Sequence, residues 1–326
     1  MSTLTSLGGV RVGHATDLEA GTGCTVVLFD EPALGGMDIG GGYASTRQAD
    51  SLRPGGRVNE VHAFLFTGGS AFGMDAASGC MTYLEERGVG FQTTSARIPT
   101  VPTAVLYDLG LGGKNRRPDA AMGRLACESA SRDPVVEGTV GAGTGCTVAK
   151  RLGYAGAWKG GIGSAFARVG RYGIGALVAV NAVGDILDPK TAQPIAVARG
   201  PKGWRPPVPD APTREPRCPA PGENTTLALV CTDAPFDRNQ LCHLARMAQG
   251  GMARAIHPHN SPFDGDIVFT ASTAPRQIPR ESDLLLAELG EVAIELVAEA
   301  IVRGVRAARP LHGIPAVAYA AGHPNP

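Results

Sequence analysis

Asn224-Thr225-Thr226-Leu227-Ala228-Leu229-Val230-Cys231-Thr232 is the stretch that decides the fold. Its apolar run, 227–231, is rich in Leu and Val, which predicts a buried strand beginning at Thr225. The segment just before it, 199–224, is proline-rich and charged and is not expected to form a regular element. Composition alone favours an interdomain linker for that segment. The alternative is a loop that delivers a processing site to the start of the strand.

Further buried strands and several helices are expected along the chain. Short apolar runs that predict strands occur at 24–29, 63–66, 175–180 and 267–269. Helices are expected over 74–87 and 120–131, from 237 past 247, and over 282–308. In the last of these, apolar residues follow 3–4 spacing, with acids at its start and bases at its end, as the helix dipole favours. Strands mixed with helices indicate a layered α/β or α+β fold.

Composition narrows the class of protein. The chain has 326 residues, a formal net charge of +0 and 43% hydrophobic residues. This apolar content excludes a mostly disordered chain, and the neutral balance gives no basic footprint for nucleic acid or an anionic membrane. No apolar run approaches the ~20 residues that span a bilayer, and the start lacks the pattern of a signal peptide. The 7 cysteines include no CxxC pair, so we expect reduced thiols in a cytoplasmic protein and no structural zinc.

Most short motifs carry little functional signal on their own. The glycine-rich stretches 140–145 and 160–163 lack the spacing of phosphate-binding loops, so tight turns and close backbone packing are the expected role. No Gly-x-Ser-x-Gly motif is present, and Ser70 is expected to cap the helix that follows. His257 and His259 with Asp264 make a metal site conceivable, although solvated loop histidines are more common.

Two further patterns have ordinary explanations when each is taken alone. Asn224-Thr225-Thr226 has the form of a glycosylation sequon, but a sequon needs a secretory context that the sequence does not provide. Asp264-Gly265-Asp266 reads as a turn, because Asp-Gly is a common turn dipeptide.

Together with five other stretches, however, these patterns resemble the P1 (DmpA-type) family of self-processing hydrolases, peptidase family S58. The resemblance extends along nearly the whole chain, and the matching stretches stand in the family's order. They are VRVGHATD (10–17), FTGGSAFGMDAASG (66–79), VGAGTGCTVAK (140–150), KGGIGSA (159–165), VAVNAVGDILD (178–188), NTTLALVCTDA (224–234) and FDGDIVF (263–269).

The resemblance implies a chain that cuts itself just before a strand and frees an N-terminal nucleophile. The cut would fall between Asn224 and Thr225, giving an α chain of residues 1–224 and a β chain of residues 225–326. The Asn-Thr junction, Lys150 and Asp264-Gly265-Asp266 are similar to the endo-acting 6-aminohexanoate-oligomer (nylon oligomer) hydrolases. The aminopeptidase members cut at Gly-Ser and tend to carry Tyr and Ser-Gly-Glu instead. Asn181 matches the family's oxyanion-stabilising Asn.

Chemistry supports these implied roles. A Thr hydroxyl is a weak nucleophile that needs a base, and the freed α-amine of Thr225, with an ordinary pKa of ~7.7–8.0, lies beside it. Lys150 would lower that pKa by like-charge repulsion, although spacing alone fits a solvated loop lysine equally well. An Asn181 N–H on the oxyanion would contribute ~3 kcal/mol. Asp264 and Asp266 would orient the nucleophile. Before the cut, Lys150 or the two Asp residues are the candidate bases.

The resemblance also implies the fold and the partners. It implies a four-layer αββα sandwich of the DmpA and ornithine acetyltransferase type, one intertwined domain over residues 1–326, and a homotetramer. The segment 200–224 would then be a surface loop, and neither a metal nor an organic cofactor is implied. The leading hypothesis is an amide hydrolase acting on small amides or peptides, with an aminopeptidase as the alternative. An acyltransferase of the ornithine acetyltransferase type and a non-catalytic binding protein are the alternatives of another class.

Overall fold

The computed structural model describes residues 2–113, 116–200 and 222–320. The helices are α1 (Ala76–Glu85), α2 (Ala120–Glu128), α3 (Arg238–Ala255) and α4 (Asp283–Arg306). The strands are β1 (Val10–Asp17), β2 (Thr22–Ile39), β3 (Thr46–Arg47), β4 (Val61–Thr67), β5 (Phe91–Gln92), β6 (Arg97–Ile98), β7 (Thr103–Val105), β8 (Thr147–Val148), β9 (Trp158–Lys159), β10 (Ile162–Val169), β11 (Tyr172–Asn181), β12 (Asp185–Leu187), β13 (Pro194–Ala196), β14 (Thr225–Thr232), β15 (Ile256–His257) and β16 (Ile267–Ser272).

The long strand β2 belongs to both of the large sheets. Its first part pairs with β1 and β4, and β4 continues the sheet to β7 and β3. Its last part, from Leu34 to Ile39, pairs with β16, which continues through β14 and β11 to β10. β14 and β16 are parallel neighbours, whereas β11 runs antiparallel to β14 over the whole of β14. The strand expected to begin at Thr225 is therefore central in its sheet.

Three hydrophobic cores separate the layers. In β14, Leu227 and Leu229 face the other sheet, whereas Ala228 and Val230 face α3 and α4. This alternation follows from the period of two in a strand, and because both faces are buried, the run has no polar side. Phe64 of β4 packs against Phe269 of β16 with ring centroids 5.0 Å apart, which joins the two sheets.

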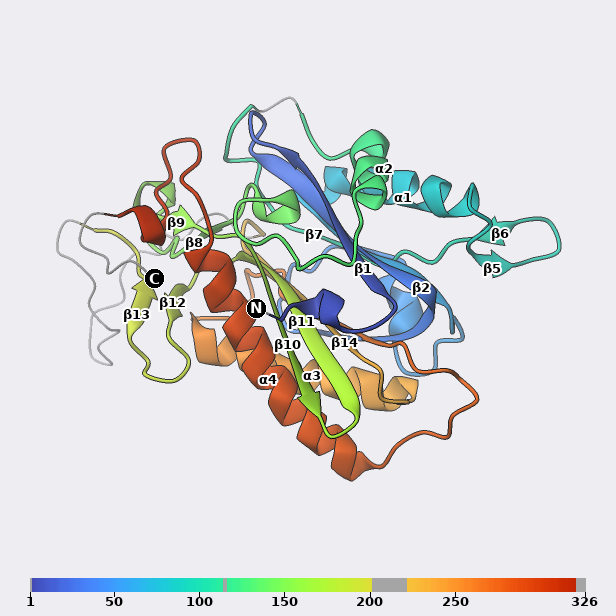
Figure 1. Ribbon diagram of the computed structural model, residues 1–326. Coiled ribbons are helices and arrows are strands. Elements are labelled where there is room, and N and C mark those ends of the chain that lie inside the picture. The colour runs from blue at the N-terminus through green and yellow to red at the C-terminus, as the bar shows by residue number, and fades with distance from the viewer. Residues whose placement is uncertain (1, 114–115, 201–221, 321–326) are drawn as a thin grey trace.

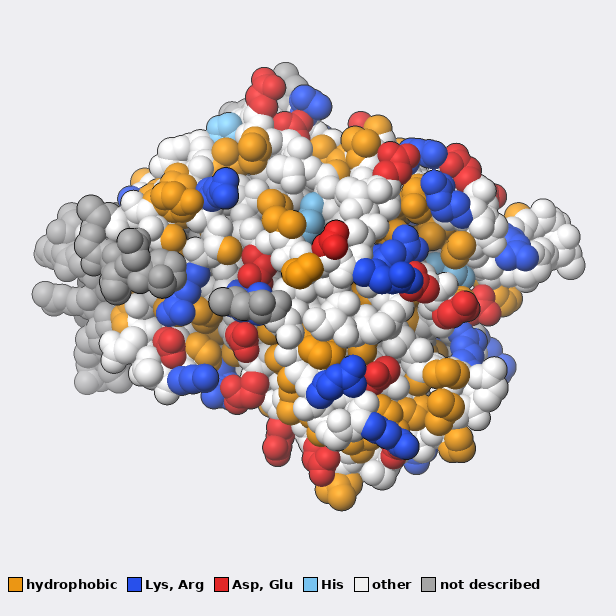
Figure 2. Space-filling model, in the orientation of Figure 1, with side chains coloured by type: hydrophobic (Ala, Val, Ile, Leu, Met, Phe, Trp, Pro, Cys, Tyr) orange, Lys and Arg blue, Asp and Glu red, His pale blue; other side chains and the backbone are white. Residues whose placement is uncertain are grey.

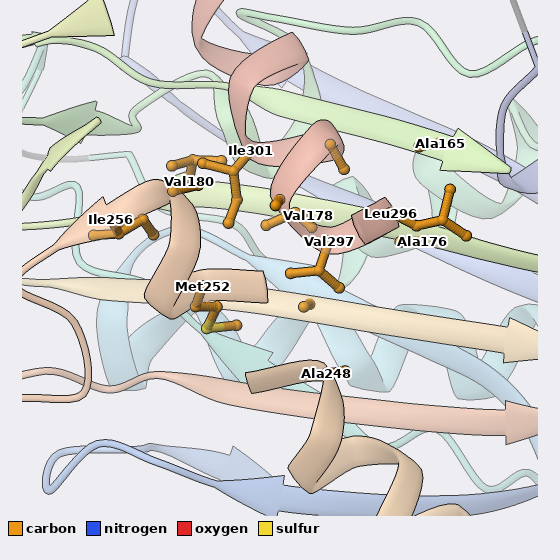
Figure 3. Close-up of a cluster of buried hydrophobic side chains, with 14 of the residues drawn as sticks. Ala165, Ala176, Val178, Val180, Ala248, Met252, Ile256, Leu296, Val297 and Ile301 are labelled. Carbon is orange, nitrogen blue, oxygen red and sulfur yellow. The ribbon is translucent and has the colours of Figure 1, made fainter. Parts of the chain in front are cut away.

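Helices cover the two outer faces of the paired sheets. α1 and α2 lie on one side, and α3 and α4 lie on the other (Figure 1). Figure 3 shows Val297 and Ile301 of α4 close to Val178 and Val180 of β11, with Met252 of α3 beside them. The arrangement is an αββα sandwich, which confirms the fold that the resemblance implied.

The expected helices and strands are found, and most of their ends shift by a few residues. The exception is the strand expected at 24–29, which is the first part of the much longer β2, Thr22–Ile39. Asp237 caps α3 through a capping box with Gln240, and Ser282 caps α4 by accepting from the N–H of Leu285. The expectation for Ser70 was wrong. It has a positive φ of 54° and opens a 3-10 turn, Ser70–Asp75, so α1 begins six residues later without a side-chain cap.

The glycine-rich loop 140–145 packs tightly, as expected. A Cβ on Gly143 would stand 2.5 Å from the backbone nitrogen of Ile162, and Gly141 has a positive φ of 51°. These glycines let the loop lie against β1, β2 and β10, where a larger residue would not fit.

Other expectations concern the surface and the thiols. On the face drawn in Figure 2, basic and acidic side chains are interspersed without a large patch of one sign. Among the described helices, none is both long enough and apolar enough to cross a membrane. The cysteines of the described residues are free and buried: Cys24, Cys80, Cys127, Cys146, Cys231 and Cys242. Most of the proline-rich segment, residues 201–221, lies outside the described residues.

Candidate active site

The candidate nucleophile lies at the first position of a central strand. Thr225 begins β14 and is directly opposite Asn181, the last residue of β11. Residues opposite each other in an antiparallel pair point to the same face, and the alternation of both strands makes this the face between the sheets. Thr225 is 4% exposed and Asn181 is fully buried, so strand pairing alone brings these two side chains together.

The Asn181 amide is held from both ends. Its Oδ1 accepts from the backbone N–H of Thr147 and from Lys150 Nζ, each at 3.0 Å. Its Nδ2 donates to the carbonyl of Tyr107 at 2.8 Å. Donors on one end and an acceptor on the other fix which end carries the N–H. One N–H of Nδ2 remains for a further acceptor in the site.

Lys150 is a buried lysine, which rules out the solvated loop lysine as an interpretation of this residue. Besides Asn181 Oδ1, its Nζ donates to the carbonyl of Asn181 at 3.1 Å and to the carbonyl of Glu223 at 3.2 Å. Burial lowers the pKa of Lys150 to about 8, because the surroundings disfavour the charged form. The ammonium therefore links Asn181 to the backbone just before the proposed cut.

The carbonyl of Asn224 accepts two hydrogen bonds in the uncut chain. Thr225 Oγ1 donates to this oxygen at 2.6 Å, and the backbone N–H of Gly265 donates to it at 2.8 Å. A backbone donor such as the Gly265 N–H stabilises the negative charge that develops on a carbonyl oxygen under attack. Asn224 itself is 1% exposed, so its side chain is not presented for glycosylation.

The Asp266 carboxylate accepts from the backbone beside Thr225, whereas the Asp264 carboxylate accepts from its own loop. The Thr225 hydroxyl donates to the Asn224 carbonyl rather than to either aspartate. Asp266 Oδ1 accepts from the N–H of Thr226 at 2.5 Å, and its Oδ2 accepts from Asn260 at 2.9 Å. Asp264 accepts from Ser261 through Oδ2, whereas its buried Oδ1 has no partner. Burial, followed by the neighbouring charge of Asp264, raises the pKa of Asp266 to about 7. Asp266 is therefore partly protonated near neutral pH.

A second buried lysine, Lys159, was missed by the sequence analysis. Its Nζ donates to the carbonyls of Thr144 at 2.7 Å and Cys146 at 2.6 Å. The next residue, Thr147, is the one whose N–H holds Asn181, so Lys159 fixes the backbone that positions the amide. Burial lowers the pKa of Lys159 to about 8. The available signal was its place in the KGGIGSA stretch, between Trp158 and two glycines.

Asp108 was also missed, and it lies next to Tyr107, whose carbonyl holds the other end of the Asn181 amide. It follows Tyr107, whose carbonyl accepts from Asn181, and its carboxylate accepts from Thr22 Oγ1 at 2.6 Å and Gly69 N–H at 2.7 Å. Burial raises the pKa of Asp108 to about 6, against the opposing effect of these hydrogen bonds and of Lys159. No sequence signal singles out this aspartate.

The structure does not support the conceivable metal site. Among the described residues, no cluster of His, Cys, Asp or Glu that could hold a metal ion is found, and this includes His257, His259 and Asp264. A cavity of about 290 Å³ lies behind the Tyr154 ring, whose centroid is 5.9 Å from Lys150 Nζ. Thr225 is not among the residues that line this cavity.

The geometry suits attack of a hydroxyl on the carbonyl carbon next to it. The nucleophile, the oxyanion donor and a titratable group must meet at one carbonyl for acyl transfer. Here Thr225 supplies the hydroxyl and Gly265 supplies an N–H, while Lys150 and Asp266 are groups that titrate near neutral pH.

Comparison with known proteins gives the family that the sequence motifs resemble, and the match extends along the chain. The sequence profile of Peptidase family S58 matches residues 2–317. An uncharacterized aminopeptidase of Mycobacterium bovis is 37% identical, with 97% of this chain and 96% of the relative covered. A 6-aminohexanoate-oligomer endohydrolase of Agromyces sp. is 30% identical, covering 83% of this chain and 75% of the relative.

A solved structure shares the fold. The L-aminopeptidase D-Ala-esterase/amidase of Ochrobactrum anthropi superposes with a TM-score of 0.74 at 24% identity, covering 94% of this chain and 86% of that one. That protein is described as a variant of the Ntn hydrolase fold.

Proposed function

The chain belongs to peptidase family S58 and is a hydrolase, and from this premise we propose that Thr225 is its nucleophile, freed by cleavage of the Asn224–Thr225 bond. The observation that carries the proposal is the pair of hydrogen bonds on the Asn224 carbonyl, from Thr225 Oγ1 at 2.6 Å and Gly265 N–H at 2.8 Å. The nucleophile and an oxyanion donor already stand at the bond to be cut.

Self-cleavage proceeds as an N→O acyl shift. Thr225 Oγ1 attacks the carbonyl carbon of Asn224 and loses its proton to a base, for which Lys150 in its neutral form and the aspartate pair are the candidates. The C–N bond then breaks, the proton goes to the departing α-amine, and an ester joins Asn224 to Thr225 Oγ1. Water hydrolyses this ester. The products are residues 1–224 and residues 225–326, which remain one intertwined domain.

In the mature enzyme, the α-amine of Thr225 acts as the base for its own hydroxyl. The nearby ammonium of Lys150 lowers the pKa of this amine and keeps more of it neutral at pH 7. Asn181 Nδ2 donates to the oxyanion, and Asp264 and Asp266 hold the start of β14 in place through the backbone. No metal or organic cofactor has a role in this sequence of steps.

The substrates are amides cleaved in the manner of the 6-aminohexanoate-oligomer endohydrolases. The 30% identical Agromyces relative and the Asn-Thr junction with Lys150 and Asp264-Gly265-Asp266 support this choice. An aminopeptidase is the second candidate, supported by the name of the 37% identical Mycobacterium relative. Comparing a free with a blocked amino terminus on one anilide substrate separates the two.

We place the processed protein in the cytoplasm as a homotetramer. Buried free thiols in the described chain fit a reducing compartment, and the exposed Phe91 and Ile98 on the β5–β6 hairpin fit a subunit contact. Light scattering on the purified protein gives the oligomeric state, and a monomer would contradict the tetramer.

Intact mass spectrometry tests the nucleophile directly. The wild-type chain should give two fragments, the second starting at Thr225, whereas Thr225→Val should remain whole. Thr226→Val is the matched control, because Thr226 is the next residue of the same strand, one position from the proposed nucleophile. A Thr225→Val chain that is still cut at this bond, or a wild-type chain that stays whole, would overturn the proposal.

A further inference from the structure

Residues 222–224, which lie on the acyl side of the proposed cut, are held in the site by main-chain contacts. Gly222 donates its N–H to the carbonyl of Phe263 at 3.1 Å, and the carbonyl of Asn224 accepts from Gly265 at 2.8 Å. Between these two contacts, the Glu223 carbonyl accepts from Lys150 Nζ at 3.2 Å. The segment also forms a parallel bridge to Asp264. Each of these three contacts uses a main-chain atom of the segment.

Maturation and catalysis pass through the same covalent state. After the N→O shift, the carbonyl carbon of Asn224 is bonded to Thr225 Oγ1, so residues 1–224 are the acyl group of an ester on the nucleophile. Substrate turnover forms the same bond from Oγ1 to the substrate carbonyl and releases the amine. In both cases water supplies a hydroxyl group to the carbonyl carbon and a proton to Oγ1. The place of residues 222–224 is therefore the place of a substrate's acyl side.

We propose, resting on the function proposed above, that the mature enzyme binds the acyl side of its substrate as an extended α-peptide of at least three residues along residues 263–265. The third residue before the cut donates its N–H to the Phe263 carbonyl, and the carbonyl of the second accepts from Lys150. Main-chain contacts of this kind add a peptide segment to an exposed backbone edge. The substrates are peptides cut internally, because the chain must continue beyond the first residue.

The spacing of the contacts distinguishes α-peptides from other amides. In an α-peptide, the nitrogen that donates to the Phe263 carbonyl is eight covalent bonds upstream of the scissile carbonyl carbon, by the connectivity of the backbone. In a 6-aminohexanoate unit the next nitrogen is only six bonds away, so its N–H falls short of that carbonyl. The site also selects a small third residue, because a Cβ on Gly222 would meet the Tyr43 ring at 3.1 Å and Gly222 has a φ of +83°.

A series of acetylated p-nitroanilides tests the proposal on the processed wild-type protein. The substrates are Ac-Asn, Ac-Glu-Asn and Ac-Gly-Glu-Asn anilides, with Ac-sarcosine-Glu-Asn as the control, in which a methyl group replaces the N–H hydrogen of the third residue. We expect kcat/KM for Ac-Gly-Glu-Asn to exceed those of Ac-Glu-Asn and the sarcosine compound by about tenfold, since an unpaired carbonyl on the protein costs ~1–3 kcal/mol. The anilide of a 6-aminohexanoate dimer should be slower than Ac-Gly-Glu-Asn.

Equal rates across the series, or faster cleavage of unblocked Asn-anilide, would overturn the extended-peptide site and leave the self-cleaving hydrolase intact. If no anilide reacts with processed protein, p-nitrophenyl esters of the same acyl groups replace them, because that leaving group needs no proton. Equal kcat/KM values for all the esters, or no cleavage of any ester, would also overturn the inference. The proposed function fails separately, through a chain that is not cut at Thr225.

On the protein side, Tyr43→Ala should change the preference for the third residue. Removing the ring opens the space beside Gly222, so the ratio of kcat/KM for Ac-Ala-Glu-Asn over Ac-Gly-Glu-Asn anilide should rise by about threefold or more. Leu125→Ala is the control, since Leu125 is 57% exposed, close to the 52% of Tyr43, and lies on α2. An unchanged ratio in Tyr43→Ala would contradict the assigned position of the third residue.

Discussion

Gly265 donates its backbone N–H to the carbonyl oxygen of Asn224 at 2.8 Å, and a Cβ on Gly265 would stand 2.7 Å from Thr225 Oγ1. One residue thus supplies a donor to this carbonyl oxygen and leaves room for the proposed nucleophile. A side chain at this position would push the hydroxyl from the carbon that it attacks. The proposed chemistry therefore requires that this position carry no side chain.

The first prediction is that Gly265→Ala slows self-cleavage while the chain still folds. Overpacking of this kind costs ~1–3 kcal/mol, and each 1.36 kcal/mol in a barrier is tenfold, so the rate should fall by about tenfold or more. The half-time of cleavage follows from intact mass against time. Gly8→Ala is the control, because a Cβ there meets nothing within 4 Å. A wild-type half-time in Gly265→Ala would show that the hydroxyl has more room than this geometry allows.

The second prediction concerns Asn181, the proposed oxyanion donor. Asn181→Ala should lower kcat by about 10²–10³ with a smaller change in KM, as expected for a contact made mainly in the transition state. Steady-state kinetics on processed protein gives both constants. Asn59→Ala serves as the control, since Asn59 accepts from Arg238 rather than from a group of the site. A rise in KM with kcat unchanged would place Asn181 in substrate binding instead.

The third prediction is that Lys159 acts through Asn181 and Lys150. Lys159→Met leaves the carbonyls of Thr144 and Cys146 without this donor and should lower kcat by about tenfold. Because the charge of Lys159 also lowers the pKa of Lys150, its removal should move the limb of the pH profile that Lys150 governs to higher pH. Lys190→Met, at an exposed lysine, should change neither quantity. A loss of activity without any shift of the profile would assign Lys159 a purely structural role.

Much of the fold follows from local patterns in the sequence. The strand at Thr225 and the helix ending at Arg306 are long, strongly patterned elements, and their types were predicted correctly. Ser70 was misjudged because a 3-10 turn intervenes before α1, and residue preferences for a cap do not detect such a turn. The pairing of β14 with both β11 and β16 joins distant segments, and no local pattern encodes which strands become neighbours.

Some residues of the candidate site could likewise be found from the sequence, and others only from the fold. Thr225, Asn181 and Lys150 were identified through their matching stretches, and the structure brings them together. Lys159 and Asp108 were missed because their importance lies in what they contact across the fold, namely the backbone on either side of Asn181. Burial also decides the chemistry of Lys150, since spacing alone left a solvated lysine equally plausible.

The fourth prediction is that Asp264→Asn weakens the pH dependence of stability. Asp266 keeps its proton up to about pH 7 in the folded chain, but only up to about pH 4 when unfolded. The folded state therefore binds more protons between these values, and the free energy of unfolding falls as the pH rises from about 4 to about 7. Removing the charge of Asp264 lowers the pKa of Asp266, so this fall should become smaller.

Urea unfolding at pH 5 and pH 8 measures this fall, in a Thr225→Val background so that one continuous chain unfolds. Asparagine can keep its Oδ1 on the N–H of Ser261, and its Nδ2 replaces the oxygen that has no partner, so the loop should be retained. Asp50→Asn is the control, because the Asp50 side chain is 88% exposed. If the difference between the two pH values is as large in Asp264→Asn as in its parent, Asp264 does not set the pKa of Asp266, and burial alone accounts for it.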